Sequence, residues 1–412
     1  MKQENSVAQS DLPKLPLPPQ IMGSEIGSFA YNTVAHRIPV IAQRVIDENK
    51  FPPDIVENLQ TLIQELPYAK VRLLKDIAAP DITAWNNYLA PYLEKNWLDI
   101  PWYFAEAYFY RRILEATNYF ILGQGQGVDP FQTQKDMGLL TSNRSIQALS
   151  YIVNKWVNSK QDWRDNLIVL MYTSLWGNRA DLSLWPAEEG DRSSLEVERE
   201  KAYILVDNSE AIADKIYSLK QGSRIDFIID NAGFELFGDL CLVDFLLATN
   251  TDEIYLHLKA HPTFVSDAMI KDIHHTIKVL TGNSDKEVQL LASRWEGYIK
   301  SDRLHLCEDL FWTSPLAFWE MPDALRQKLA DADLIFIKGD ANYRRLLGDR
   351  HWPFTTPFED IVSYFPAPMV ALRTLKAELA SGLQSKQIET LNSEDSHWLT
   401  NGRWGVIQFA NS

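Results

Sequence analysis

The sequence is poor in cysteine. Only Cys241 and Cys307 occur among its 412 residues, each inside an apolar stretch, and no C-x-x-C pair is present. Two isolated thiols cannot form the disulfide framework of a small secreted domain. We therefore expect both to be reduced side chains that fill the core of a cytoplasmic protein.

Positive charge is also scarce. The chain has 40 lysines and arginines against 55 aspartates and glutamates, which gives a formal net charge of −15. A surface with this excess repels phosphate backbones and anionic lipids, so we expect neither nucleic acid nor a membrane as a partner. Charged residues interrupt the N-terminus, and the most apolar window, 236–248, contains Asp239 and Asp244. Neither a signal peptide nor a membrane span is therefore expected.

Several common catalytic signatures are missing. The sequence has no G-x-x-x-x-G-K-[ST] loop, no G-x-S-x-G elbow and no His-Glu-x-x-His helix, which excludes the commonest types of NTPase, hydrolase and zinc protease. Residues 123–127, Gly-Gln-Gly-Gln-Gly, are similar to the glycine loop of methyltransferases and dinucleotide-binding proteins. They follow a segment with helical spacing rather than a strand, so we expect an ordinary loop there.

What the chain does contain is the composition of a folded protein, with 46% apolar and 23% charged residues. Residues 1–22 are polar and proline-rich and predict a loose tail. Residues 23–160 show apolar residues at helical spacing and predict an all-helical domain. Residues 161–412 alternate β-rich runs with helical periodicity. The sequence therefore predicts an α/β fold, in which the helical domain precedes a doubly wound α-β-α (Rossmann-like) domain with a mostly parallel sheet.

Short β-rich runs are expected to form the sheet. Their continuous apolar character indicates burial on both faces, as in parallel sheets covered by helices. The runs are Ala202–Val206, Ile225–Ile229, Glu253–Leu258, Leu304–Cys307, Leu334–Ile337, Met369–Leu372 and Val406–Phe409.

The residues that follow these runs carry the chemistry, because ligands of open parallel sheets bind beyond the carboxyl ends of the strands. Asp230 and Asn231 follow the second run, and Asp267 follows the third after a short loop. Two carboxylates held about 4 Å apart would repel by roughly 4 kcal/mol at a protein-like dielectric, so they need a positive charge between them. The oxygens of Asp230, Asn231 and Asp267 suit a hard divalent ion such as Mg²⁺ or Mn²⁺.

Basic residues gather at the same predicted edge. Lys338, Arg344, Arg373 and Lys376 would suit a phosphate group, and the helices that start beyond the second and fifth runs would offer backbone N–H groups to it. Phosphate esters hydrolyse so slowly that accelerations of up to about 10²¹-fold are needed, and we expect a site for this reaction to combine metal ions with cationic groups.

Each of these residues also fits a plainer role when taken singly. The segment 230–233 is a common turn and helix cap, and Asp267 could cap the helix that follows it. Lys338 and Arg344 could be solvated ends of elements. Their coincidence at one predicted edge is what favours a site.

Four segments of the sequence form an ordered set of motifs: Asp230–Leu236, Phe264–Asp267, Lys338–Arg344 and Arg373–Lys376. Together they resemble the damage-control phosphatase family, and the last is similar to the Arg-Thr-x-Lys motif of its third subfamily. Upstream segments similar to the family's helical domain and its junction are Ser28–Tyr31, Arg37–Pro39, Tyr110–Arg112, Leu175–Asn178 and Asp181–Ser183.

The resemblance implies a metal-dependent phosphatase of small phosphorylated metabolites, with sugar phosphates such as fructose 1-phosphate or fructose 6-phosphate as substrates. Mn²⁺, Co²⁺, Ni²⁺ or Mg²⁺ would be the cofactor. It implies that Asp230, Asn231 and Asp267 are metal ligands and that Asp230 and Asp267 are catalytic. The substrate-binding residues that it implies are Glu235, Asp340, Ala341, Asn342, Tyr343, Arg344 and Lys376. We add Lys338 and Arg373, which are basic and lie at the same predicted edge of the sheet. Ala341 replaces the more usual leucine of its segment.

Three functions stay open at this point. The first is the phosphatase, with either water or the Asp230 carboxylate as the attacking group. The second is an S-adenosylmethionine-dependent protein-glutamate methyltransferase, a name that eukaryotic family members also carry. The third is a sugar-phosphate-binding module without catalysis. The sequence leaves the oligomeric state open.

Overall fold

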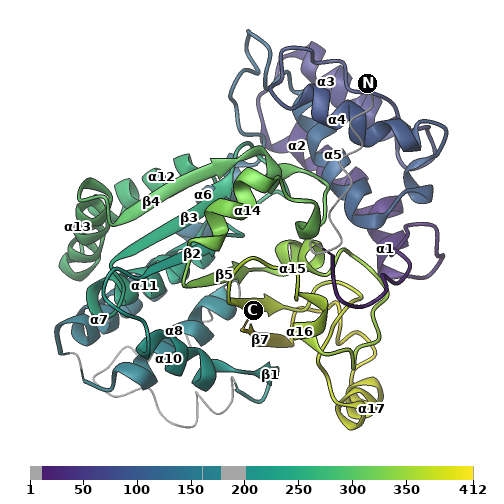
Figure 1. The fold of residues 1–412 in the computed structure, drawn as a ribbon. Helices are drawn as coiled ribbons and strands as arrows, with labels where there is room; N and C mark the ends of the chain where they lie inside the picture. Colours follow the sequence, from purple (N-terminus) through teal and green to yellow (C-terminus); the bar gives the residue numbers. More distant parts are fainter. Residues whose placement is uncertain (1–11, 160, 178–200, 412) are drawn as a thin grey trace.

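The computed structural model describes residues 12–159, 161–177 and 201–411 (Figure 1). The tail predicted at 1–22 is described from residue 12 onward, and its end is anchored. The Ile21 N–H donates to the Asp349 carbonyl at 2.9 Å, and the Ile21 carbonyl accepts the Trp102 N–H at 2.9 Å.

Every regular secondary-structure element that the structure describes up to residue 175 is helical. Helices α1–α5 gather at one side of the molecule, coloured purple to blue in Figure 1, whereas α7 and α8 lie against the sheet. The bounds are α1 Phe29–Asn32, α2 Ile38–Glu48, α3 Pro53–Glu65, α4 Ile82–Leu89, α5 Trp102–Ala116, α6 Gln132–Leu140, α7 Asn143–Ser159 and α8 Trp163–Leu175, with a π-helical turn at Thr33–Arg37.

All the predicted runs form strands of one seven-stranded sheet, in the order β1-β7-β6-β5-β2-β3-β4. Strands β6 and β7 pair antiparallel, and every other neighbouring pair is parallel. The predicted fold class, a helical N-terminal part followed by a mostly parallel α/β part, is confirmed. The strands are β1 Ile204–Asp207, β2 Arg224–Ile228, β3 Glu253–Lys259, β4 Leu304–Asp309, β5 Leu334–Lys338, β6 Met369–Thr374 and β7 Gly405–Ala410.

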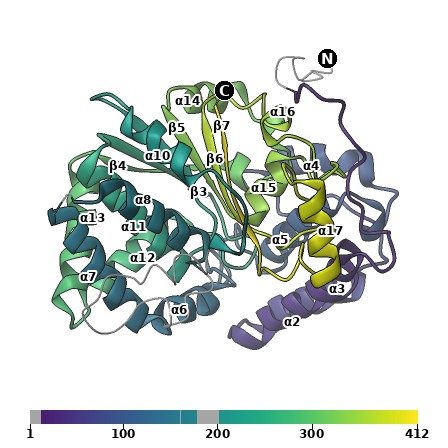
Figure 2. The same cartoon turned by 90° about the horizontal axis from the view of Figure 1, so that it is seen from below.

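Helices cover both faces of this sheet. Figure 2 shows the strands between a group that includes α7, α8 and α10–α13 and a second group that includes α5 and α15–α17. The helices that follow β1 are α10 Ser209–Tyr217, α11 Phe234–Thr249, α12 Ile270–Thr281, α13 Lys286–Lys300, α14 Asp323–Ala330, α15 Asp340–Leu346, α16 Phe358–Ile361 and α17 Ser385–Glu394.

Alternate residues of a strand belong to two different hydrophobic cores. In β5, Leu334 and Phe336 pack in the core with α7, α8 and α10–α13, whereas Ile335 and Ile337 pack in the core that α1–α5 share with α14–α16. Both faces of the sheet are buried, which is why the strand sequences are continuous apolar runs. The helical N-terminal part therefore extends the core on one face of the sheet.

The position of α7 bears on the predicted division of the chain. Leu149 and Val153 of α7 belong to the same core as α11 and α13, although α7 precedes the boundary expected at residue 160. The divisions 23–160 and 161–412 stay predictions.

Three smaller expectations also concern the fold. Cys241 is buried in α11, Cys307 is half-buried in β4, and both are free. Residues 123–127 lie in turns and bends between α5 and α6, so the loop predicted there is confirmed. No helix in the described ranges combines the length and apolar character that a membrane crossing needs.

Candidate metal and phosphate site

Main-chain pairing joins the segments that follow β2 and β3. The Ala268 N–H donates to the Asp230 carbonyl at 2.8 Å. Asn231 and Asp267 form an isolated antiparallel bridge beside it. The two segments predicted to hold a metal ion are therefore brought together by backbone hydrogen bonds.

The side chains at this junction form a buried acidic cluster. Asn231 Nδ2 donates to Asp230 Oδ2 at 2.7 Å and to Glu235 Oε2 at 2.9 Å, while its Oδ1 accepts from Ser266 Oγ. Asp230 is 6% exposed and Asp267 1%. Within the described part of the chain, Asp230 Oδ1 and Asp267 Oδ2 are buried without a hydrogen-bond partner.

Burial shifts the titration of both aspartates. It raises the pKa of Asp230 well above the ordinary value, and the charges of Asp267 and Glu235 raise it further. Burial also raises the pKa of Asp267. The Lys259 ammonium is the largest charge that lowers both values. A cation between the carboxylates would lower both pKa values, because an opposite charge favours the ionised form.

The donor atoms suit a hard divalent cation. No group of three or more His, Cys, Asp and Glu side chains among the described residues is arranged to hold a metal ion. The predicted set lies below that number because it consists of two carboxylates and one carboxamide. Its two carboxylate oxygens that accept no hydrogen bond from the described residues are atoms that a cation would satisfy. The residues therefore fit such an ion, and Asn231 Oδ1 would be the third oxygen.

Lys259, the last residue of β3, is a member of the cluster that sequence reasoning did not assign. Its Nζ lies 3.4 Å from Asp267 Oδ2, 3.2 Å from Asn342 Oδ1 and 3.3 Å from the Trp312 carbonyl. The side chain is buried, and burial lowers its pKa. The signal in the sequence was a lysine that ends a run buried on both faces, where a charge needs a partner.

Lys338 lies behind the cluster rather than on an open rim. Its Nζ is 3.1 Å from Asp239 Oδ1 and 4.0 Å from Glu235 Oε1, and it donates to the Ser174 carbonyl. Burial raises the pKa of Asp239 to about 6. Lys338 is 1% exposed, so it acts on Glu235 and Asp239 and not on solvent.

The start of α15 and the loop after β6 form a second edge of the site. Asp340 Oδ1 accepts from Arg373 Nε at 2.8 Å and from the Lys376 N–H at 3.2 Å. The remaining Arg373 bonds go to the carbonyls of Leu379 and Ala377, which fold this loop around the guanidinium. The Lys376 side chain is exposed, and its charge lowers the pKa of Asp230.

Asn342 and Ala341 line the inner side of α15. Asn342 Nδ2 donates to the Lys338 carbonyl at 2.8 Å, and its Oδ1 accepts from Lys259. Asn342 therefore links the ends of β3 and β5. Ala341 is half-buried and packs against the core that α1–α5 share with α14–α16.

Tyr343 and Arg344 have their polar atoms engaged elsewhere. The Tyr343 hydroxyl donates to Gln408 Oε1 of β7 at 2.8 Å. Arg344 forms a two-pronged ion pair with Asp349, at 2.8 and 3.0 Å, and its Nη1 donates to Glu106 Oε2 of α5 at 2.5 Å. The structure does not bring these two side chains to the acidic cluster.

Two glycines allow backbone to approach the cluster closely. Gly339 has a φ of +86°, and a Cβ atom there would lie 1.9 Å from Asp230 Oδ2. The turn into α15 therefore abuts the Asp230 carboxylate. A Cβ atom on Gly177 would lie 2.8 Å from Glu235 Cα. Asn178 and the segment 181–183, which the family resemblance also includes, lie outside the described residues.

Comparison with known proteins gives consistent results. Residues 33–391 match the family model described as "Damage-control phosphatase ARMT1-like domain". The chain is 34% identical to Damage-control phosphatase ARMT1 of Danio rerio, over 96% of this chain and 97% of that protein. It is 33% identical to the Homo sapiens protein of the same name, over 95% and 98% of the two chains.

Among solved structures, a DUF89 family protein from Pyrococcus horikoshii is similar with a TM-score of 0.48 and 16% identity, over 93% of this chain and 98% of that one. The family match and the near full-length relatives agree with the resemblance that the four motifs carry. The chain belongs to the damage-control phosphatase family, with an ARMT1-like domain, and is a phosphatase.

Proposed function

We propose that this phosphatase hydrolyses small sugar phosphates, such as fructose 1-phosphate or fructose 6-phosphate, with one divalent cation held by Asp230, Asn231 and Asp267. The observation that carries the proposal is that two buried carboxylate oxygens, Asp230 Oδ1 and Asp267 Oδ2, accept no hydrogen bond from any described residue. Mn²⁺, Co²⁺, Ni²⁺ or Mg²⁺ would neutralise these carboxylates and polarise a phosphate oxygen. The ion would thus offset the repulsion between substrate and cluster.

Lys376 and Asp340 would bind the two ends of the substrate. The exposed Lys376 ammonium acts electrostatically on Asp230 and would neutralise phosphate oxygens beside it. Asp340 uses only Oδ1 in its hydrogen bonds with described residues. Its Oδ2 would accept a hydrogen bond from a sugar hydroxyl. Glu235 and Asn342 would fix Asn231 and Lys259 around the reacting group.

The reaction itself needs one attacking oxygen and one leaving alcohol. Water or Asp230 Oδ1 attacks phosphorus and the ester P–O bond breaks. The proton that the leaving sugar oxygen takes up comes from the attacking water in the first route and from solvent in the second. An attack by Asp230 would leave a phosphoaspartate that water then hydrolyses. Rapid acid quench during turnover separates the routes, because only the second gives phosphorylated protein.

Lys338, Tyr343, Arg344 and Arg373 would act through other residues rather than on the substrate. Their polar atoms are engaged with Asp239, Gln408, Asp349 and backbone carbonyls. We assign them to holding β5, α15 and the loop after β6 in place.

No second function is favoured by the geometry. The glycine loop that suggested methyl transfer lies between two helices, α5 and α6, and does not follow a strand. The free cysteines support action in the cytoplasm, and the net charge of −15 supports a small molecule rather than nucleic acid as the partner.

A turnover screen tests the proposal. Phosphate release is measured from a sugar-phosphate panel with each of the four metals and with EDTA. We expect metal-dependent turnover that falls more than about a hundredfold in Asp230→Asn and in Asp267→Asn, since even loss of an outer partner of a metal ligand costs 10–100-fold. Asp54→Asn, on the exposed side of α3, is the control. Turnover that is unchanged by EDTA or by both site variants would refute the assignment.

A further inference from the structure

A second cavity lies between the N-terminal helices, the segment 315–320 that ends in the 3-10 turn Phe318–Glu320, and the segment around the end of α15. It has a volume of about 290 Å³ and is lined by residues of α4, the start of α5 and the segments 315–320 and 345–350. No residue predicted for the metal and phosphate site lines it. The Tyr103 ring, which lines the cavity, stacks at 5.3 Å on Phe264 of the loop that leads to Asp267.

The cavity wall holds an unbalanced positive charge. Arg345 is 1% exposed, yet its guanidinium donates only to the Ser314 hydroxyl and to backbone carbonyls, among them Leu316 and Phe311, both at 2.8 Å. No carboxylate in the described part of the chain forms an ion pair with it, and burial lowers its pKa. Buried charges are normally paired, because desolvation without a partner is costly.

Arg350 adds a second guanidinium, on a side chain that is half-buried. Its Nη1 donates to the Pro18 carbonyl at 2.6 Å, but its Nε is buried and has no partner among the described residues. Asp349 does not balance this charge, since both of its oxygens accept from Arg344. Among the described residues that line the cavity, the Glu320 carboxylate is then the one acid left to balance the two guanidinium groups.

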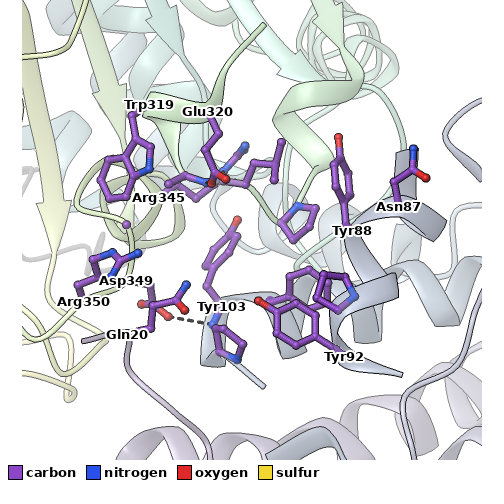
Figure 3. Close-up of a pocket in the computed structure, with 17 residues that line it drawn as sticks. Gln20, Asn87, Tyr88, Tyr92, Tyr103, Trp319, Glu320, Arg345, Asp349 and Arg350 are labelled. Atoms are coloured by element: carbon purple, nitrogen blue, oxygen red, sulfur yellow. Dashed lines mark hydrogen bonds between the residues drawn. The ribbon is translucent and has the colours of Figure 1, made fainter. Parts of the chain in front are cut away.

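The rest of the wall is aromatic. Figure 3 shows the rings of Tyr88, Tyr92 and Tyr103 on one side of the cavity and Trp319 with Arg350 on the other. Tyr103 is 5% exposed, and its hydroxyl, which Figure 3 shows pointing toward Arg345, makes no hydrogen bond with any described residue. Flat rings favour a planar or ring-shaped ligand body, and the free hydroxyl offers it one donor and one acceptor.

We propose that this cavity is a second small-molecule site that binds an organic oxyanion, with a carboxylate or phosphate held by Arg350 Nε and the Tyr103 hydroxyl. Arg345 supplies further positive charge at short range. The ring-shaped body of the ligand packs between the tyrosines and Trp319. Carboxylate and phosphate share the geometry that a guanidinium recognises.

Two probes distinguish the sources of the anion. Isothermal titration of the full chain with benzoate and with phenyl phosphate, in EDTA to prevent turnover, measures binding. We expect at least one to bind at concentrations up to about 10 mM. Affinity should fall about tenfold in Arg350→Gln and severalfold in Tyr103→Phe, which removes only the hydroxyl. Benzyl alcohol, which keeps the ring without the charge, should bind more weakly.

Asp230→Asn separates this site from the catalytic one, because its effect should be confined to the acidic cluster and leave binding of the probes unchanged. Tyr103→Phe keeps the test decisive if Arg350→Gln unfolds. The proposal is overturned if neither anion binds. It is also overturned if binding is lost in Asp230→Asn but kept in Tyr103→Phe and Arg350→Gln.

Discussion

At the scale of single residues, the charge balance of the candidate site depends on Lys259. Two buried carboxylates lie beside it, and its ammonium is the largest charge that lowers their pKa values. Lys259 is also tied to Asn342 and to the Trp312 carbonyl, so its position is determined by three elements. In the protein without metal, this lysine is the charge that holds Asp267 in place.

We expect Lys259→Met to lower the free energy of unfolding of the metal-free protein by about 3 kcal/mol or more, because removing one partner of a buried charge pair leaves the other uncompensated. Urea unfolding in EDTA measures this loss. At the proposed metal site Mn²⁺ would neutralise the same carboxylates, so adding it should recover more stability in the variant than in the wild type.

Lys300 provides the control for this experiment. It is exposed at the end of α13 and pairs with Glu296 at 3.3 Å. Lys300→Met should change the free energy of unfolding by about 0.5 kcal/mol at most, as expected for an exposed pair. If the two lysine variants lost the same stability, the role assigned to Lys259 would be wrong.

The residues that sequence reasoning located are those whose position follows from a strand end. Asp230, Asn231 and Asp267 could be placed together because parallel neighbours end at one edge. The role of Arg344 could not be predicted, because its partner Glu106 is 238 positions away in the sequence. A basic residue near a predicted site has no sequence feature that says which acid it will pair with.

At the scale of elements, α11 shows how buried acids are accommodated. Asp239 and Asp244, which argued against a membrane span, are both fully buried in this helix. Each meets a base from another element: Asp239 lies 3.1 Å from Lys338 of β5, and Asp244 lies 2.6 Å from Arg294 of α13. These acids therefore specify how α11 docks on its neighbours.

Asp239 should make stability depend on pH. Burial raises its pKa to about 6, whereas an unfolded aspartate titrates near 3.9. The folded state therefore binds the Asp239 proton more tightly than the unfolded state does. This difference stabilises the folded state fully below about pH 4, and the stabilisation is lost as the pH rises through 6. A difference of about two units between the folded and unfolded pKa values corresponds to roughly 3 kcal/mol in the free energy of unfolding.

Asp239→Asn keeps the shape of the side chain and removes its titration. We expect the free energy of unfolding of the wild type to fall between pH 4.5 and pH 7.5 by roughly 2 kcal/mol more than that of the variant, because part of the stabilisation is already lost at pH 4.5. Urea unfolding at both pH values gives the comparison. Equal pH dependence in the two proteins would show that Asp239 titrates normally.

Elements were easier to predict than their partners. The strand runs were recognisable because both faces of the sheet are buried, so Leu334–Ile337 differs from β5 by one residue at its end. The helical period of α7 revealed an apolar face but not what covers it. That face packs against α11 and α13 rather than against α1–α5, since periodicity reports amphipathicity and carries no information about neighbours.

At the scale of the whole molecule, helices α1–α5 are held on the α/β part by buried charge as well as by apolar contact. Arg344 of α15 bonds Glu106 of α5 and stacks over Trp102 at 3.7 Å. Asp349 accepts both from Arg344 and from the Tyr103 N–H at 2.9 Å. Arg344 thus joins the N-terminal helices to α15, the helix whose residues the sequence predicts to bind the substrate.

A pair of variants distinguishes this role from substrate binding. Arg344→Lys should lower the free energy of unfolding by about 3 kcal/mol, because lysine cannot reproduce the two-pronged bond to Asp349 in a buried setting. Its KM for a sugar phosphate that the wild type hydrolyses, measured well below the Tm of the variant, should stay within about twofold of the wild-type value. Lys376→Met should do the reverse and raise KM about tenfold with little change in stability, since an exposed ammonium that binds phosphate contributes to affinity and not to folding. Raised KM with unchanged stability in Arg344→Lys would instead place Arg344 on the substrate, as its motif predicted.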